Sequence, residues 1–117
     1  MSTNTNESHE PTGLAKTPEP PYYAVIFTSK RTAGDNGYGD MAESMVMLAS
    51  EQPGFLGVES ARGSDGVGIT VSYWASLEAI RNWKANPLHI AAQNKGRSDW
   101  YENYGVRISK VERDYFF

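Results

Sequence analysis

The sequence predicts an α+β domain in which a four-stranded antiparallel sheet carries its helices on one face. Three observations support this prediction. A run that is apolar on both alternating sides begins at Tyr22 and is typical of a buried strand. Two later strand patterns are joined by Gly63–Gly66, a turn sequence that indicates a hairpin. The connections before and after this hairpin both have apolar residues at helical spacing.

The first 21 residues are expected to be a disordered tail, followed by one domain over residues 22–117. The tail lacks aromatic residues and holds four of the six prolines. Such a segment cannot bury enough apolar surface to offset the entropy lost on ordering. His9 lies in this tail, so we do not expect it to have a functional role.

The ordered domain begins with a strand at residues 22–28, YYAVIFT. A helix is predicted over residues 38–52, because apolar residues recur from Met41 at positions i, i+4, i+7 and i+8. The Pro53-Gly54 pair ends this helix, since proline cannot continue it.

The hairpin consists of strands at residues 55–62 and 67–74. A second helical stretch starts after Ser76, whose hydroxyl can cap the helix. The stretch breaks at Asn86-Pro87, where Asn86 can cap again and proline takes the first helical position at no cost in hydrogen bonds. The inner face of the first part of this stretch is expected to hold Leu77, Ile80 and Trp83.

The last strand is predicted over residues 106–115. The order strand, helix, strand, strand, helix, strand is the split βαβ, ferredoxin-like arrangement (β-α-β-β-α-β). Right-handed crossovers place both helices on the same face of the sheet. The other face then carries apolar side chains with nothing to cover it, which predicts a homodimer formed sheet against sheet. The apolar end at residues 115–117 is expected to contribute to this interface.

Composition excludes several classes of function. The net charge is −3 with both signs interspersed, so we expect no nucleic-acid partner. The chain has no cysteine, which excludes disulfides and thiolate sites. No apolar run approaches the ~20 residues of a membrane span, and the beginning of the chain lacks the pattern of a signal peptide. We therefore expect a cytoplasmic protein without a membrane partner.

Several stretches resemble the antibiotic biosynthesis monooxygenase (ABM) domain family, and in particular its branch of small bacterial proteins. The resemblance covers about residues 22–115 and is carried by YYAVIF, QPGFLGVESARG, GITVSYW and SLEAIRNWKANPLHIAAQNKGRSDWY. It implies a dimeric α+β barrel with a pocket between helices and sheet in each subunit. It also implies oxidation of a phenolic substrate by direct reaction of its carbanion with dioxygen, without metal or flavin.

The resemblance assigns candidate catalytic positions to the second helical stretch. Trp83 matches the tryptophan that family enzymes have there. Their tyrosine two turns later corresponds to His89, and their lysine one turn beyond corresponds to Gln93. Their upstream asparagine corresponds to Ala79, with Asn82 close by. The haem-degrading branch has its iron-ligating histidine at the position of Gln93, and glutamine is a poor iron ligand. Haem is therefore a disfavoured alternative, and the expected reaction needs no cofactor.

His89 and Trp83 are the candidate catalytic residues. His89 is the only histidine in the expected domain, and imidazole titrates near neutrality, as a general base requires. Its alternative role is that of an exposed or capping residue early in a helix. Trp83 has packing in the core as its alternative.

Six further residues are candidates for contacting a substrate: Asn82, Gln93, Tyr73, Trp74, Arg62 and Tyr104. Tyr73 and Trp74 are neighbours in a strand, so they point to opposite faces of the sheet, and both can instead be core residues. Arg62 can pair with an anionic substrate or form a surface salt bridge. The sequence offers no cluster of metal ligands.

Two functions therefore remain open. The first is a cofactor-independent monooxygenase that oxidises an aromatic or quinol-like small molecule. The second is a non-enzymatic dimeric module that binds a small ligand or has a structural role. An enzyme needs a base that a substrate can reach, whereas a binding module does not.

Overall fold

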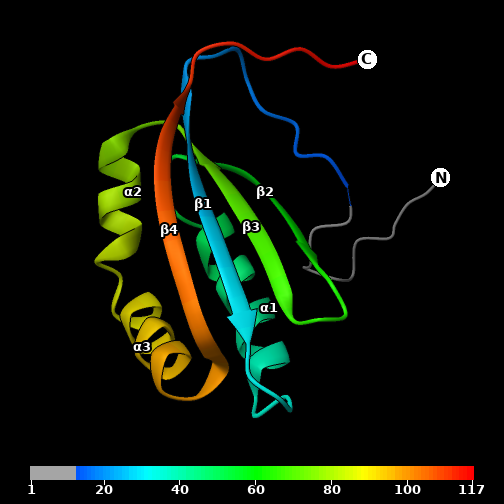
Figure 1. Ribbon diagram of the computed structural model, residues 1–117. Helices are drawn as coiled ribbons and strands as arrows, with labels where there is room; N and C mark the ends of the chain where they lie inside the picture. The colour runs from blue at the N-terminus through cyan, green and yellow to red at the C-terminus, as the bar shows by residue number, and fades with distance from the viewer. Residues whose placement is uncertain (1–12) are drawn as a thin grey trace, which may run out of the picture.

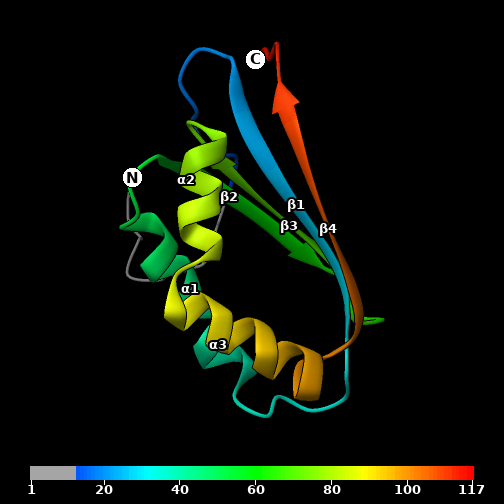
Figure 2. The same ribbon diagram turned by 90° about the vertical axis from the view of Figure 1, so that its left-hand side faces the viewer.

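The computed structural model describes residues 13–117, and their elements follow the predicted order (Figure 1). The strands are β1 (Tyr22–Arg31), β2 (Phe55–Arg62), β3 (Val67–Trp74) and β4 (Tyr101–Val111). The helical elements are α1 (Tyr38–Ser50), α2 (Leu77–Lys84), α3 (Pro87–Lys95) and the short π-helix η1 (Gly96–Trp100). All helices lie on one face of the sheet (Figure 2), which confirms the predicted α+β, ferredoxin-like fold.

The sheet has the strand order β2-β3-β1-β4, and all neighbouring strands are antiparallel. Its register decides which side chains share a face, because cross-strand partners point to the same side. Val25 of β1 is paired with Ser72 of β3 and with Ile108 of β4. Val25 packs against the core beneath the helices, so Ile108 also lies on the helix-facing side.

The core is centred on Trp74, which is completely buried. Ala49 of α1 and both Ala79 and Ile80 of α2 pack around it. The ring of Phe55 meets the Trp74 indole edge to face, with centroids 5.4 Å apart. Trp74 is therefore the residue through which both helices are packed on the sheet.

Two polar caps shape the connection from β3 to β4. The Ser76 hydroxyl accepts a hydrogen bond of 3.0 Å from the Ala79 amide, and the Asn86 side chain accepts from the Leu88 amide at 2.9 Å. Pro87 follows Asn86 at the start of α3, as predicted. The chain thus turns between α2 and α3 without leaving the first amides of α3 unpaired.

Two local expectations were wrong. The last strand is Tyr101–Val111 rather than residues 106–115. It starts earlier because Tyr101 and Tyr104 pair with Arg31 and Ser29 of β1 around a bulge. Leu77 is not on the inner face of α2 but 44% exposed. It is the first residue of the helix, and Ile80 and Ala79 take the buried positions.

The outer face of the sheet is partly covered, contrary to the expectation that nothing covers it. Tyr22 and Ala24 lie on this face and are both buried. The residues 13–21, which belong to the predicted tail, reach this face. The Ala15 amide donates a hydrogen bond of 2.9 Å to the Glu59 carboxylate, and the Thr17 hydroxyl donates one to the Tyr22 hydroxyl. The first twelve residues lie outside the described part of the chain.

Candidate active site

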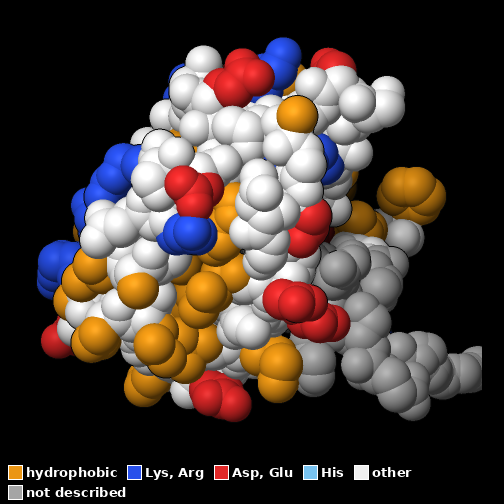
Figure 3. All heavy atoms as spheres, turned by 90° about the horizontal axis from the view of Figure 1, so that it is seen from below, with side chains coloured by type: hydrophobic (Ala, Val, Ile, Leu, Met, Phe, Trp, Pro, Cys, Tyr) orange, Lys and Arg blue, Asp and Glu red, His pale blue; other side chains and the backbone are white. Residues whose placement is uncertain are grey.

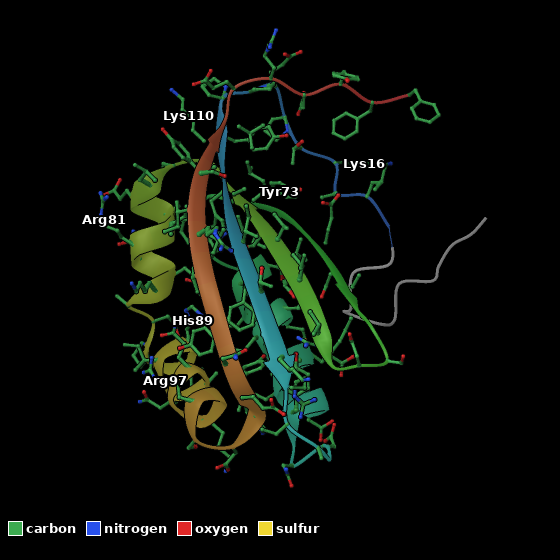
Figure 4. All side chains as sticks on the ribbon, viewed as in Figure 1. Lys16, Tyr73, Arg81, His89, Arg97 and Lys110 are labelled. Atoms are coloured by element: carbon green, nitrogen blue, oxygen red, sulfur yellow. The ribbon has the colours of Figure 1, made fainter. Side chains whose placement is uncertain are left out.

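Three aromatic rings from three elements are stacked beside the core. The Trp83 indole of α2 lies 4.2 Å from the His89 imidazole of α3, with ring planes inclined by 12°. Trp83 also stacks on Trp74 of β3, with ring centroids 6.1 Å apart and planes inclined by 25°. Figure 4 shows His89 where α2 gives way to α3. The two candidate catalytic residues are thus in direct contact, although five residues separate them in the chain.

A backbone hydrogen bond fixes the orientation and the tautomer of His89. Its Nδ1 lies 3.0 Å from the carbonyl oxygen of Trp83. A carbonyl oxygen only accepts hydrogen bonds, so Nδ1 carries the proton and Nε2 keeps its lone pair. Asn86 also accepts from the His89 amide at 3.4 Å. The end of α2 and the cap of α3 together hold the imidazole with a basic nitrogen available.

Burial lowers the pKa of His89 below its ordinary value of 6.5. The hydrogen bond to the Trp83 carbonyl favours the protonated ring and therefore raises the pKa. The positive charge of Lys84 lowers the pKa further. The net direction is downward, so His89 is neutral at pH 7. A neutral imidazole with a free Nε2 lone pair can accept a proton from a substrate.

The helix-facing side of β4 is open to solvent and apolar. Val106 and Ile108 share this side with Phe27 and Val25 of β1 through the strand register. They are nevertheless 48% and 49% exposed, so the helices do not cover them. We call Val106 and Ile108 the β4 strip. In Figure 2 the helices α2 and α3 lie on the same side of the sheet as this strip, which leaves an apolar surface on the side that carries His89.

Trp74, Gln93 and Asn82 lie on the elements that build the stack. Trp74 is part of the stack itself. Gln93 is half-buried one turn after His89, and Asn82 is exposed on α2 beside Trp83. Tyr73 lies on the opposite face of the sheet, where its hydroxyl donates to Glu59 at 2.6 Å. The structure therefore separates Tyr73 from the other aromatic candidates.

Arg62 and Tyr104 lie on the helix-facing side, at the end of the sheet away from Trp74. The Arg62 guanidinium donates to the carbonyl of Gly66 at 2.6 Å and to the hydroxyl of Ser29 at 2.8 Å. It forms no salt bridge within residues 13–117. The Tyr104 ring packs on Phe27 with centroids 5.1 Å apart, and its hydroxyl accepts from Arg97 at 3.0 Å.

Two features of this site were missed in the sequence. The β4 strip was not identified, although the alternation of Val106 and Ile108 along one strand was visible. Whether a strand face is covered depends on where the helices pack, and this is not a local property. The hydrogen bond that Arg97 donates to Tyr104 was also missed, because no local pattern brings η1 and β4 side chains together.

Comparison with known proteins places the chain in a family. Residues 22–95 match the model of the antibiotic biosynthesis monooxygenase family. The chain belongs to this family. A relative from Bacillus subtilis (strain 168), named uncharacterized protein YqjZ, is 62% identical over 104 residues, which are 89% of this chain and 91% of the relative. The family membership predicted from the sequence is thereby confirmed.

Two solved structures share the fold at low sequence identity. SnoaB, a cofactor-independent oxygenase from Streptomyces nogalater, superposes with a TM-score of 0.70 at 12% identity, covering 81% of this chain and 97% of SnoaB. Rv0793 from Mycobacterium tuberculosis has a TM-score of 0.70 at 10% identity, covering 80% and 97%. At such identities the likeness shows the fold alone.

The described part of the chain has neither a cluster of metal ligands nor a membrane-spanning helix. Residues 13–117 contain no group of three His, Asp or Glu side chains arranged to hold a metal ion. None of the helices formed by these residues is long and apolar enough to span a membrane.

Proposed function

We propose that this ABM-family protein is a cofactor-independent monooxygenase that oxidises an aromatic or quinol-like molecule, with His89 as its general base. The observation that carries the proposal is the hydrogen bond between His89 Nδ1 and the Trp83 carbonyl. It leaves Nε2 as a proton acceptor on a ring that burial keeps neutral at pH 7.

The proposed reaction starts when Nε2 of His89 takes a proton from the substrate. An anthrone, which has an acidic CH₂ group conjugated with a ketone, illustrates the step. Its carbanion gives electrons to dioxygen, and a carbon–oxygen bond forms. The imidazolium returns its proton to the peroxide oxygen, and loss of water then yields the quinone. One anthrone and one dioxygen thus give one quinone and one water.

Trp83 is proposed to border the substrate with an edge of its half-buried ring, because Trp74 and His89 both stack on the indole. These two contacts fix the orientation of the ring. The β4 strip supplies apolar surface on the same side of the sheet. A flat substrate on this surface would exclude water from the reacting carbanion. Gln93, half-buried one turn after His89, is the candidate hydrogen-bond donor to the oxyanion.

The alternative is a non-enzymatic module that binds a small ligand on the same surface. It is favoured by the departures from the family pattern at Ala79, His89 and Gln93, which leave only Trp83 unchanged among the matched positions. Binding needs the apolar surface and the indole, but it does not need the fixed tautomer of His89.

Replacing His89 by alanine tests the proposal. If His89 is the base, oxygen-dependent oxidation of a model anthrone should fall by about 10²–10⁴-fold, the usual effect of losing a positioned base. His9→Ala is the matched control, because it removes the other histidine of the chain. If the wild-type protein does not accelerate this oxidation at all, the binding module is the correct function.

We also propose that the protein forms a homodimer through the part of the outer sheet face that exposes Val67 and Ile69 of β3. Val67 and Ile69 are exposed there, and residues 13–21 contact the other half of the face around Tyr22 and Glu59. Light scattering at micromolar concentration should give twice the chain mass. Substituting Ile69 by lysine should return a folded monomer, because an unpaired charge would have to be buried in the interface.

A further inference from the structure

A cation lies at one end of the β4 strip. Tyr104, Val106 and Ile108 alternate along β4 and share its helix-facing side. The Tyr104 hydroxyl accepts a hydrogen bond of 3.0 Å from Nη1 of Arg97, so the guanidinium lies beside the first of these three residues. Seen from below (Figure 3), Lys and Arg side chains border exposed hydrophobic ones on the side of the molecule where α3 and β4 lie. Apolar surface and positive charge therefore occur together here.

The charge of Arg97 is not neutralised within residues 13–117. The only ion pair of this part of the chain joins Lys95 to Asp99. Arg97 instead donates to two neutral oxygens, that of the Tyr104 hydroxyl and, at 2.7 Å, that of the Asn94 amide. A guanidinium carries five N–H donors, so this exposed side chain has donors left for a ligand.

The Tyr104 hydroxyl adds a second donor. It accepts from Arg97, and a phenol that accepts a hydrogen bond can still donate its own proton. No acceptor among the described residues receives this proton. A carboxylate can take one hydrogen bond from the guanidinium and one from the phenol, and bonds between charged partners are about twice as strong as neutral ones. The two side chains are thus suited to bind an organic acid.

Two other arginines on the helix-facing side of the sheet are engaged within the fold. Arg62 donates to the carbonyl of Gly66 at 2.6 Å, and Arg31 donates to the carbonyl of Trp100 at 3.0 Å. Both are half-buried, whereas Arg97 is exposed and bonded to side chains. A ligand can therefore reach the unused donors of Arg97 without breaking a contact to the backbone.

We propose that Arg97 and Tyr104 bind the carboxylate of an aromatic acid whose rings lie on the β4 strip. We call these two residues the carboxylate site. The charge of Arg97 complements that of the carboxylate, and Val106 and Ile108, which are 48% and 49% exposed, offer apolar surface to the rings. Arg97 thus takes the role that the sequence suggested for Arg62, that of pairing with an anionic substrate.

The carboxylate site also narrows the substrate class, and this part rests on the proposed function. Arg97 follows His89 by eight residues, a separation of about 12 Å along a helix that rises 1.5 Å per residue. A substrate held by Arg97 has to extend over a distance of this order to bring its acidic CH₂ group to Nε2 of His89. Fused rings extend further than a single ring does. The inferred substrate is therefore a fused-ring quinol or anthrone that carries a carboxylate.

Equilibrium dialysis with two quinones tests the carboxylate site without catalysis. Anthraquinone-2-carboxylate and 2-(hydroxymethyl)anthraquinone share their ring system and differ in the acid group. The wild-type protein should bind the carboxylate about tenfold more tightly, as expected for hydrogen bonds to a charged group. Arg97→Gln should bind both quinones equally, and Tyr104→Phe should lose part of the preference. The matched control Arg107→Gln should keep it, because Arg107 lies between Val106 and Ile108 in β4 and points to the opposite face.

The outcomes separate the carboxylate site from the proposed function. Equal binding of the two quinones by the wild-type protein, binding of neither, or an unchanged preference in Arg97→Gln would overturn the carboxylate site and leave the oxygenase proposal standing. If Arg97→Gln does not fold, Arg97→Lys and Tyr104→Phe decide instead, since both should weaken the preference. A preference for the carboxylate without any anthrone oxidation would retain the carboxylate site and overturn the oxygenase.

Discussion

Tyr73 and Trp74 are adjacent in β3, yet they belong to two faces of the sheet that are stabilised in different ways. Trp74 is completely buried among apolar side chains. Tyr73 is only half-buried, and its hydroxyl donates to the Glu59 carboxylate. One face is held by packing, and the other is held by bonds from tyrosine to carboxylate.

The same physical effect has opposite chemical consequences on these faces. Burial disfavours the charged form of a titratable group. It lowers the pKa of His89 on the helix-facing side and thereby keeps a base available near pH 7. On the outer face burial and the neighbouring Glu59 raise the pKa of Tyr73, so this phenol stays protonated. Of these two groups, only the one on the helix-facing side can exchange protons at physiological pH.

Truncation of Trp74 should have the largest effect on stability. Trp74→Ala removes a fully buried indole that contacts both helices, and such changes cost about 3–5 kcal/mol. Urea unfolding followed by circular dichroism measures the loss. Trp74→Phe, which keeps an aromatic ring, should recover part of it. A loss below 1 kcal/mol would mean that Trp74 is not the residue on which the helices are packed.

Removing the hydrogen bond between Tyr73 and Glu59 on the outer face should reduce stability less than truncating Trp74 does. Tyr73→Phe removes the hydrogen bond to Glu59 and should cost about 1–2 kcal/mol, since bonds to charged acceptors are stronger than neutral ones. Glu59→Gln provides the second arm of a double-mutant cycle in the same urea assay. The two changes should be non-additive, because each removes the same bond. Strict additivity would show that the bond contributes nothing to stability.

The fold was predictable where the signal lies within a short stretch of sequence. The hairpin around Gly63–Gly66, the cap at Asn86 and the alternation of Tyr73 and Trp74 each depend on a few neighbouring residues. The stacking of Trp83 on His89 was not predicted, although only one helix break separates the two residues in the chain.

Features that depend on distant residues were not predictable. Glu59 accepts from Ala15, 44 residues earlier in the chain, and no local pattern indicates such a partner. Arg62 was interpreted as a possible ligand for an anion, but its donors meet Ser29 and Gly66, whose oxygens are brought there by strand pairing. The exposure of Val106 and Ile108 likewise depends on how closely the helices pack on the sheet.

Loss of the cap of α3 should have a smaller effect on stability than loss of Trp74. Asn86→Ala removes the acceptor for the Leu88 and His89 amides and should cost about 1 kcal/mol. Asn86→Asp, which keeps the acceptor, is the matched control. Because the cap also orients His89, anthrone turnover should fall in Asn86→Ala and stay near the wild-type value in Asn86→Asp. Equal turnover in both variants would show that the cap does not position the imidazole.

The smallest effect on stability is expected from the titration of His89. Its pKa in the folded protein lies below 6.5, so between these two values the unfolded chain binds more protons than the folded one. The contribution of His89 to the free energy of unfolding therefore rises with pH between the folded pKa and 6.5. It is fully present above 6.5 and is lost as the pH falls through the folded pKa. Urea unfolding from pH 7 to pH 5 should show the wild-type protein losing more stability than His89→Gln, which cannot bind the proton. The His89 imidazole signals in proton NMR should shift with a midpoint below 6.5, and a midpoint above that value would contradict a buried, neutral base.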